Sequence, residues 1–535
     1  SRDANRTGNG YCSSVCCMYA VKEAMIAKEH AHGDLDCAIF NMDMRTFGKD
    51  YEKYYNRARD KDGVRFPKAR IHTIDELPES GDLTVKYADE TGAMQEETFS
   101  MVVLSVGLQI QPDTARLAES LGVELNKYNF IDTSPFKPVE TSRQGVYTCG
   151  VIQGPKDIPG SITEASAAAW AAGAKLAEAR GSDIETIEIP EERDVTAEEP
   201  RIGVFVCNCG INIGGIVDVP DVREYAKTLP NVTFAVDNLF TCSQDTQELI
   251  KEKIQEHHLN RVVVASCSPK THEPMFMETL EACGHNKYLF EMANIRNQNS
   301  WIHSKEPDAA TQKAKDLVRM SVARAANLGT LHEKVVDVNQ RALVIGGGIA
   351  GMNAALSLGD QGFEVALIEK DAELGGFARK LHHTIEGEDI PAYLEKLTAD
   401  VNDHQKVKLF TNAGIVGFEG FKGSFKTEVE VDGERQKIDH GIIIVATGAT
   451  EYQPKEFLYG EDKRVVTQVE LSDMLAQKGA GDLNSVVMIQ CVGSRNEENE
   501  NCSKICCQNA VKNALDIKNQ NPETNVYVLY RDIRT

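Results

Sequence analysis

Two features that this 535-residue chain lacks exclude several kinds of protein. Its longest apolar runs, such as GIIIVA and ASAAAWAAGA, are far shorter than the roughly 20 residues that a membrane-spanning helix needs. Positive charge is scarce too, because 58 Lys and Arg stand against 81 Asp and Glu, for a net charge of −23. Nucleic acids and anionic membranes bind clustered positive charge, so neither is an expected partner. With no signal-peptide pattern in the first residues, we expect a cytoplasmic protein without a membrane span.

What the chain does contain is a normal supply of core residues and many cysteines. Its length and its 41% hydrophobic content predict three or four globular domains. Fourteen cysteines are too many for packing alone, and disulfides rarely persist in a reducing compartment. The cysteines are clustered, which indicates metal. Neither end carries a start or stop signal, so we expect a fragment of a longer polypeptide.

The two ends of the chain are copies of one segment. CSSVCCMYAVK at residues 12–22 matches CSKICCQNAVK at residues 502–512. Both copies continue to Asp-x-Arg-Thr, at residues 43–46 and 532–535, where we expect a strand to end. Such agreement indicates tandem modules rather than chance.

The second copy lies in a predicted βαβ unit. A strand at 484–490, a helix that begins near residues 503–506 and a strand at 525–530 flank a loop that is glycine-rich in ordinary dinucleotide domains. Here the loop carries cysteines, whose thiolates gain from the positive end of the helix and are suited to one [4Fe–4S] cluster. Zinc and unliganded thiols remain alternatives. The candidate ligands are Cys491, Cys502, Cys506 and Cys507, with Cys12, Cys16 and Cys17 in the first copy.

A second cysteine set lies in the middle of the chain. Residues 201–300 alternate between strands and helices, which predicts a doubly wound parallel sheet. Ligands of such sheets gather at the carboxyl ends of strands. Four cysteines follow three of the predicted strands and form a second candidate cluster site, unless they are simply buried thiols: Cys207, Cys209, Cys242 and Cys267. We expect Cys37, Cys149 and Cys283 to be structural.

Residues 341–370 read as strand, glycine-rich turn, helix, strand and acid. The glycines supply a tight turn, close approach to a pyrophosphate and tight helix packing, and the acid is placed to bond a ribose hydroxyl. A later Glu-Leu-Gly-Gly and a strand-end Ala-Thr-Gly-Ala favour FAD over NAD; the alternative is a Rossmann domain that binds no nucleotide. The predicted contacts are Gly346, Gly348, Gly351, Glu369, Lys370, Gly375, Gly376, Ala446, Thr447 and Gly448.

A third flavin element is predicted in residues 145–174. A turn at Gly150 precedes an Ala-rich helix that begins near Ser161 and includes Ile162. In flavoproteins a helix of this kind points its N-terminus at the flavin. A plain amphipathic helix explains the pattern equally well.

These motifs together resemble the A-subunit family of heterodisulfide reductase, in a tandem arrangement. GVFVCNCGINIGGIVDV, NRVVVASCSPKTHEPMF, KYLFEMANIRNQNSWIH, LVIGGGIAGMNAAL and the Cys-x10-Cys-x3-Cys-Cys loop carry the resemblance, which covers nearly the whole chain. It implies an α/β protein with Rossmann-like, thioredoxin-reductase-type flavin domains and a doubly wound parallel-sheet iron–sulfur domain. The Cys-x2-Cys-x2-Cys ferredoxin inserts of some members do not occur in this sequence.

The resemblance also implies the order of the domains. Residues 1–195 correspond to the C-terminal part of a first flavin and iron–sulfur module, truncated at its start. Residues 196–335 correspond to the N-terminal iron–sulfur domain of a second module. Residues 336–535 correspond to its FAD-binding Rossmann domain with the start of an inserted cluster-binding βαβ domain, truncated at its end. We expect residues 1–185 to pair with 336–535 as in a circular permutation, with the two cysteine helices competing for one place.

The function that follows is electron transfer between FAD and [4Fe–4S] clusters. We expect the protein to work in a complex with other heterodisulfide-reductase-like subunits and with ferredoxin or hydrogenase-type electron donors. Electron bifurcation is one mode in which such a complex could work. Because cysteines occupy the nucleotide loop, we expect no nicotinamide site in the second domain. No catalytic acid, base or nucleophile is evident. Two alternatives are a self-contained thioredoxin-reductase-like disulfide or NAD(P)H oxidoreductase and a zinc-stabilised scaffold.

Overall fold

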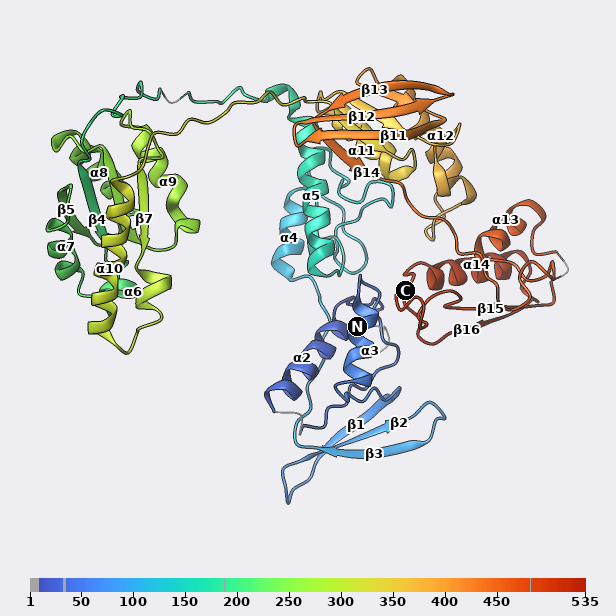
Figure 1. The fold of residues 1–535 in the computed structure, drawn as a ribbon. Coiled ribbons are helices and arrows are strands. Elements are labelled where there is room, and N and C mark those ends of the chain that lie inside the picture. Colours follow the sequence, from blue (N-terminus) through green and yellow to red (C-terminus); the bar gives the residue numbers. More distant parts are fainter. Residues whose placement is uncertain (1–8, 32–34, 187, 482) are drawn as a thin grey trace. The chain divides into compact units, whose positions relative to one another are not determined.

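The computed structural model describes residues 9–31, 35–186, 188–481 and 483–535, and it divides into two units. Unit 1 is formed by residues 1–180 and 337–535, and unit 2 by residues 181–336. No helix in the described ranges is long and apolar enough to cross a membrane. Both units contain helices and a parallel sheet, so the predicted α/β class is confirmed (Figure 1).

Unit 2 is built on a four-stranded parallel sheet in the order β5-β4-β6-β7. The central strands are buried along their whole length, as expected for a sheet covered on both faces. The strands are β4 (Ile202–Cys207), β5 (Val232–Asn238), β6 (Arg261–Ser266) and β7 (Phe290–Asn294).

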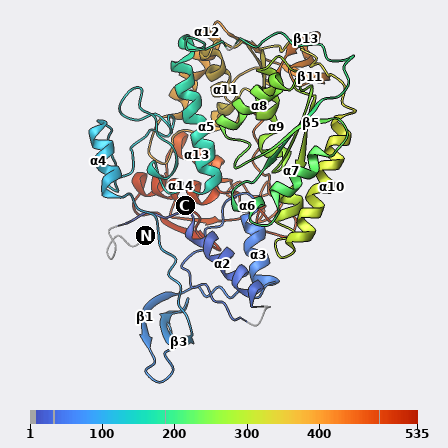
Figure 2. The same cartoon turned by 90° about the vertical axis from the view of Figure 1, so that its left-hand side faces the viewer.

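Helices cover both faces of this sheet (Figure 2). α7 and α10 pack with Val204 and Val206 on one face, whereas α8 and α9 pack with Phe205 and Val264 on the other. This is the doubly wound arrangement that the alternating pattern predicted. The helices are α6 (Ile211–Gly214), α7 (Val219–Lys227), α8 (Gln244–Glu256), α9 (Pro269–Glu281) and α10 (Pro307–Ala325), with a π-helical turn η3 (Arg296–Ser300).

Unit 1 contains a second parallel sheet, in the order β10-β9-β8-β14. Helices α11 and α12 pack on one face of it, and an antiparallel meander that the sequence did not reveal packs on the other. The elements are β8 (Ala342–Ile345), α11 (Ile349–Asp360), β9 (Val365–Ile368), η4 (Gly376–Lys380), α12 (Ile390–Asp403), β10 (Val407–Phe410), β11 (Ala413–Phe421), β12 (Ser424–Val431), β13 (Glu434–His440) and β14 (Ile442–Val445).

The N-terminal part of the chain packs onto this sheet domain. The ring of Phe136 stacks on Tyr393 of α12, with ring centroids 4.0 Å apart, and Ser134 donates a hydrogen bond to Glu388. The Ala-rich helix α5 lies against α11. Residues 1–180 and 337–535 therefore share one unit, in the pairing expected for a circular permutation. The elements of this part are α4 (Pro112–Ser120), η1 (Gly150–Ile152), α5 (Ile158–Lys175) and η2 (Ala177–Ala179).

Both copies of the cysteine segment form a helix of their own. α2 (Cys16–His30) and α14 (Cys506–Gln520) each begin at the first of the adjacent cysteines. The second copy is the predicted βαβ unit, in which β15 (Ser485–Ile489) pairs in parallel with β16 (Asn525–Leu529), next to α13 (Gln468–Lys478). The two helices do not compete for one place, because each packs in its own apolar cluster.

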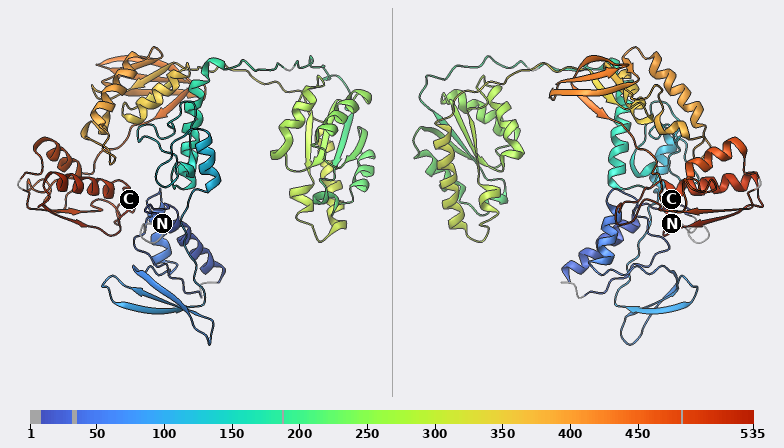
Figure 3. Two further views of the ribbon diagram at one scale, coloured as in Figure 1. Left: turned by 180° about the vertical axis from the view of Figure 1, so that it is seen from behind. Right: turned by 45° about the vertical axis from the view of Figure 1, so that its right-hand side comes forward.

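The prediction that a strand ends at Thr46 is wrong. Residues 38–46 form only isolated bridges, from Ala38 to Arg65 and from Asn41 to Lys68. A strand needs a continuous ladder partner, and these residues contact a short irregular segment instead. Figure 3 shows this region from two sides, with α3 (Tyr51–Asp60) above a small antiparallel sheet of β1 (Arg70–Glu76), β2 (Leu83–Ala88) and β3 (Met94–Phe99).

We predict that Phe136→Ala lowers the free energy of unfolding of the chain by about 2 kcal/mol, because it removes a stacked, partly buried ring. Urea denaturation followed by circular dichroism measures the change. Phe421→Ala is the matched control, since Phe421 is 60% exposed. Equal effects of the two substitutions would contradict the packing of the N-terminal part on α12.

Candidate functional site

The glycine-rich turn after β8 is shaped by two contacts that leave no room for side chains. A Cβ atom on Gly351 would lie 1.8 Å from the carbonyl oxygen of Gly346, and a Cβ on Gly346 would lie 2.3 Å from the carbonyl oxygen of Ala446. Gly346 also has a φ of +109°, which disfavours other residues. These glycines let α11 begin directly against the ends of β8 and β14.

Gly348 differs, because its backbone φ is −76° and a Cβ there would meet nothing within 4 Å. The space in front of Gly348, at the start of α11, is therefore open. A diphosphate approaching the amides of a helix N-terminus needs such an open, side-chain-free face. The geometry fits the role that the sequence predicted for Gly348.

Glu369 stands at the end of β9 and is nearly buried. One carboxylate oxygen accepts a 2.6 Å hydrogen bond from the amide of Gly347, and the other accepts a 2.9 Å bond from the amide of Asp371. A carboxylate has further lone pairs for a ribose hydroxyl. Lys370, the next residue, is exposed.

The other predicted flavin contacts surround the same turn. Gly375 pairs with Gly348 across an isolated bridge, and its amide donates a 2.8 Å hydrogen bond to the carbonyl of Gly347. Ala446 follows β14, and its amide bonds the carbonyl of Ile345 at the end of β8. The described structure therefore gathers the glycine turn, Glu369, the Gly375–Gly376 pair and Ala446 at one edge of the sheet; Thr447 and Gly448 come next along the chain.

The N-terminal end of α5 belongs to the same unit. Its N-cap Asp157 accepts hydrogen bonds from the amide of Gly160 and from the hydroxyl of Tyr51. The amide of Gly150 donates to Glu164, which also pairs with Lys156 at 2.7 Å. Ile162 is 62% exposed on the first turns of this helix. Unit 1 thus holds Gly150 and Ile162 as well as the Rossmann turn.

The four cysteines of unit 2 follow the carboxyl ends of β4, β5 and β6. The sulfur of Cys207 accepts hydrogen bonds from the amides of Cys209, at 3.3 Å, and Thr241, at 3.4 Å. The pKa of Cys242 is raised by burial and then by the charges of the other three thiols, Cys207, Cys267 and Cys209. The parallel sheet therefore brings the other three sulfurs within electrostatic reach of Cys242.

Buried polar atoms beside these cysteines lack partners. Within the described ranges, Asn238 Oδ1, Thr241 Oγ1 and Ser266 Oγ are buried without a hydrogen bond. Each comes from the end of a strand or the loop that carries a cysteine. Unsatisfied buried atoms are rare in folded proteins and point to a water, ion or cofactor that pairs with them. The donor set and these atoms fit an inorganic centre.

Arg296 is a functional candidate that sequence reasoning missed. Its guanidinium donates a 3.4 Å hydrogen bond to the sulfur of Cys209 and stacks on Trp301. The positive charge stabilises a thiolate, and hydrogen bonds to sulfur tune the potential of iron–sulfur centres. Only the π-helical turn after β7 places Arg296 there, so the sequence offered no local signal.

The loop of the second copy gathers its four cysteines in the same way. Burial raises the pKa of Cys491, and the nearby Arg495, 3.9 Å from its sulfur, opposes that shift. The pKa of Cys506 is raised by its hydrogen bond with Cys507, by burial and by the charges of Cys507, Cys491 and Cys502. Gln490 Nε2, next to Cys491, is one of the buried atoms without a partner in the described ranges.

The first copy repeats this local geometry. Ser14 and Lys504 occupy the same position of the repeat, and both have a left-handed backbone, with φ values of +62° and +68°. The amide of Ser14 bonds the sulfur of Cys12 at 3.3 Å, and the amide of Lys504 bonds the sulfur of Cys502 at 3.4 Å. The two copies therefore share the same left-handed turn and the same amide-to-sulfur hydrogen bond.

Each adjacent cysteine pair shares a hydrogen bond that separates its two pKa values. In the first copy the bond lowers the pKa of Cys16 to about 5 and raises that of Cys17. In the second copy it lowers the pKa of Cys507 to about 6 and raises that of Cys506. The lowered member is the first cysteine in one copy and the second in the other.

In the part of the chain that the structure describes, no three His, Cys, Asp or Glu side chains are close enough to hold a single metal ion. In a cubane cluster each thiolate binds its own iron, so the four sulfurs stand further apart than around one ion. The cysteines of the described ranges therefore do not form a tight tetrahedral site for one ion.

The comparison with protein families agrees with the glycine turn and the sheet around it. The family model described as pyridine nucleotide-disulphide oxidoreductase matches residues 5–173 and 340–489. The chain belongs to the pyridine nucleotide-disulphide oxidoreductase family. It is therefore an oxidoreductase with a Rossmann-like fold, as the sequence predicted. The matched ranges end at Ile489, before the four-cysteine loop, and leave out unit 2.

The chain is also similar to the A-subunits of heterodisulfide reductases, which confirms the resemblance inferred from its motifs. It is 36% identical over 437 residues to the A-subunit of the H2:CoB-CoM heterodisulfide,ferredoxin reductase of Methanothermobacter thermautotrophicus, covering 64% of this chain and 66% of that protein. It is 41% identical over 305 residues to a heterodisulfide reductase A-subunit-like protein of Archaeoglobus profundus, covering 56% and 43%. The chain thus spans just under two thirds of the length of the former relative.

Among solved structures, thioredoxin reductase of Lactococcus lactis matches with 17% identity and a TM-score of 0.25, covering 37% of this chain and 68% of that one.

We predict that two glycine substitutions in the turn affect the stability of the protein to very different extents. Gly351→Ala would lower the free energy of unfolding by about 2–3 kcal/mol, because its Cβ has no room beside the carbonyl of Gly346. Gly348→Ala, which meets open space, would change it by less than about 0.5 kcal/mol. Denaturation curves of both variants measure this. A stable Gly351→Ala protein would show that the turn is not packed as described.

Proposed function

We propose that this chain is part of an iron–sulfur flavoprotein that passes electrons between FAD and [4Fe–4S] clusters within a cytoplasmic complex. The observation that carries the proposal is the combination in one chain of a Rossmann turn with an acid at the end of β9 and two four-cysteine sets, one at the carboxyl ends of parallel strands and one between β15 and the start of α14. Each set supports one cluster, and the turn supports one flavin.

The residues proposed to hold FAD are those around the β8 to α11 turn. The amides at the start of α11 would bind the pyrophosphate, with Gly348 leaving the approach open, and Glu369 would bind the adenosine ribose. Gly375, Gly376 and the Ala446–Gly448 segment would line the rest of the nucleotide. Gly150 and Ile162, at the start of α5, are the contacts proposed for the flavin ring.

The residues proposed to hold iron are the two complete cysteine sets, with Cys12, Cys16 and Cys17 as three of the ligands of a further set. Bound FAD exchanges an electron pair and can return electrons singly, whereas each cluster carries one electron. The chain's own contribution is to fix the sulfurs by amide hydrogen bonds and to place Arg296 and Arg495 beside them. Hydrogen bonds to the sulfurs would tune the potential of a bound cluster.

The proposed partners follow from the relatives. The Methanothermobacter relative is named as one component of a reductase of heterodisulfide and ferredoxin. We propose that this chain works beside the other components of such a complex and exchanges electrons with ferredoxin or a hydrogenase-type donor. Electron bifurcation is the finer form of this proposal. Because cysteines replace the nucleotide loop at Cys491–Cys507, we also propose that the second domain has no nicotinamide site.

We predict about four iron atoms for each complete cysteine set, hence about eight per chain after anaerobic purification. Cys242→Ser and Cys502→Ser are each expected to lose about four irons and the matching sulfide, because each removes one ligand of a different set. Iron and acid-labile sulfide analysis measures this loss.

Cys283→Ser is the matched control for iron content. Cys283 is a partly buried thiol of unit 2 that donates a hydrogen bond to the carbonyl oxygen of Thr279 and belongs to neither set. Its loss should leave the iron content unchanged. Iron-free protein that reduces disulfides would support a thioredoxin-reductase-like enzyme instead, and bound zinc without flavin absorbance would support a scaffold.

We predict that Gly348→Ala and Glu369→Gln each weaken FAD binding by roughly tenfold or more, because one blocks the pyrophosphate and the other removes a charged hydrogen-bond acceptor. Fluorescence titration of the flavin-free protein with FAD gives the dissociation constants. Thermal unfolding of the same variants checks that the fold is retained. Unchanged FAD affinity in both variants would show that the flavin binds elsewhere than at this turn.

A further inference from the structure

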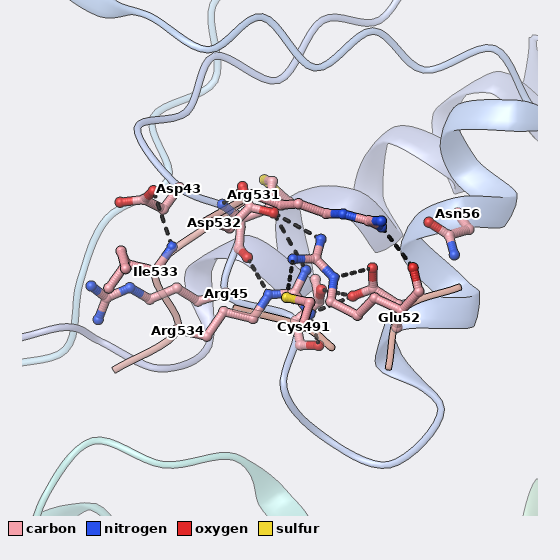
Figure 4. A network of polar contacts seen from close by, with 12 residues as sticks. Asp43, Arg45, Glu52, Asn56, Cys491, Arg531, Asp532, Ile533 and Arg534 are labelled. Carbon is pink, nitrogen blue, oxygen red and sulfur yellow. Dashed lines mark hydrogen bonds and ion pairs between the residues drawn. The ribbon is translucent and has the colours of Figure 1, made fainter. Parts of the chain in front are cut away.

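The C-terminal segment 532–535 contacts the segment that occupies the same place in the first copy, residues 43–46 (Figure 4). The amide of Met44 donates to Asp532 at 3.2 Å, and the amide of Ile533 donates to Asp43 at 3.3 Å. Asp43 and Asp532 are the same residue of the repeat, as are Met44 and Ile533. The two hydrogen bonds are therefore the same interaction made in both directions.

The arginines of the two copies also make reciprocal hydrogen bonds. Arg45 donates to the carbonyl oxygen of Thr535, and Arg534 donates at 2.9 Å to the carbonyl oxygen of Thr46. Within each copy, the aspartate carbonyl accepts from the second of the adjacent cysteines, Cys17 or Cys507, at 3.8 Å in both cases. A contact in which each residue meets the counterpart of its own partner is isologous, as in a two-fold dimer.

A buried ion network adds to this contact. Glu52 of α3 pairs with Arg495 at 2.7 Å and with Arg534, and Arg495 also pairs with Asp532 at 2.9 Å. The side chains of Arg534, Glu52 and Arg495 are only 1%, 4% and 5% exposed. A buried charge is costly unless it is paired, so removing one member leaves a strongly unfavourable charge behind.

The two-fold is incomplete in one respect. The Nε of Arg534 donates a 2.9 Å hydrogen bond to the carbonyl oxygen of Met44, whereas the Nε of the equivalent Arg45 is buried without a hydrogen-bond partner in the described ranges.

We propose that the Asp-x-Arg-Thr segments are a self-complementary docking surface by which two consecutive modules of this chain bind each other in cis. The partner that fits residues 43–46 is the second copy of the same segment, residues 532–535. The inference does not depend on the proposed cofactors, because it rests on protein atoms alone. It does place the second cysteine of each adjacent pair beside one shared contact.

Hydrogen–deuterium exchange of the full 535-residue chain tests the proposal. Asp43→Ala removes the acceptor for the amide of Ile533, and Asp532→Ala removes the acceptor for Met44. Each is expected to speed exchange about tenfold or more in the peptide of the other segment, 488 or 490 residues away in sequence. Peptides of β8 and α11 report whether unit 1 is still folded.

Asp113→Ala in α4 is the control, because Asp113 pairs with the nearby Arg116 on the surface. It should change exchange in neither segment. Unchanged exchange at 42–46 in Asp532→Ala, with β8 and α11 still protected, would overturn the proposal.

Dilution separates contact within one chain from contact between chains. Protection of both segments that persists on roughly hundredfold dilution, with a monomeric mass by light scattering, supports docking in cis. Loss of protection together with dissociation of a dimer would overturn it in favour of two copies of the chain.

The incomplete two-fold provides a matched pair of substitutions. Arg534→Met leaves Glu52 buried with one partner fewer, and should speed exchange at 42–46 roughly a hundredfold. Arg45→Met, at the same position of the repeat, leaves Glu52 with both of its arginine partners and should have an effect smaller by about tenfold or more. Equal effects would show that the ion network does not hold the segments together.

Discussion

Parallel strand pairing is the constraint on which the rest of this structure depends. All pairs in the sheets β10-β9-β8-β14 and β5-β4-β6-β7 are parallel, so the carboxyl ends of all strands of a sheet lie at one edge. In unit 1 that edge collects the glycine turn and Glu369. In unit 2 it collects Cys207, Cys209, Cys242 and Cys267 from segments up to 60 residues apart.

The glycine turn shows how strictly backbone contacts fix such a site. Gly346 and Gly351 are required because a side chain at either position would collide with a carbonyl oxygen, whereas Gly348 faces open space. Gly346 and Gly351 build the turn, and Gly348 leaves its face open. The same fingerprint therefore combines a folding requirement with the proposed binding role, and the two are separable by substitution.

The repeat gives the molecule its second organising feature. Ser14 and Lys504 adopt the same rare backbone, and their amides bond the sulfur two residues earlier in the same way. The copies then meet through Asp43 and Asp532, so one sequence motif serves both as a cysteine loop and as a surface for its own counterpart. Duplication of a module provides such self-complementary surfaces without new residues.

The sequence by itself determined the local elements: the alternation of residues 201–300, the turn at Gly346–Gly351, the βαβ unit around Cys491–Cys507 and the family to which these belong. Those features come from period, spacing and residue type over a few tens of residues. The meander β11–β13, the contact of Arg296 with Cys209, the failure of residues 38–46 to form a strand and the docking of 43–46 on 532–535 were decided by tertiary structure alone. Each of these features depends on contacts with residues far away in the sequence. A contact between residues 488 positions apart, for example, cannot be predicted from the local sequence around either of them.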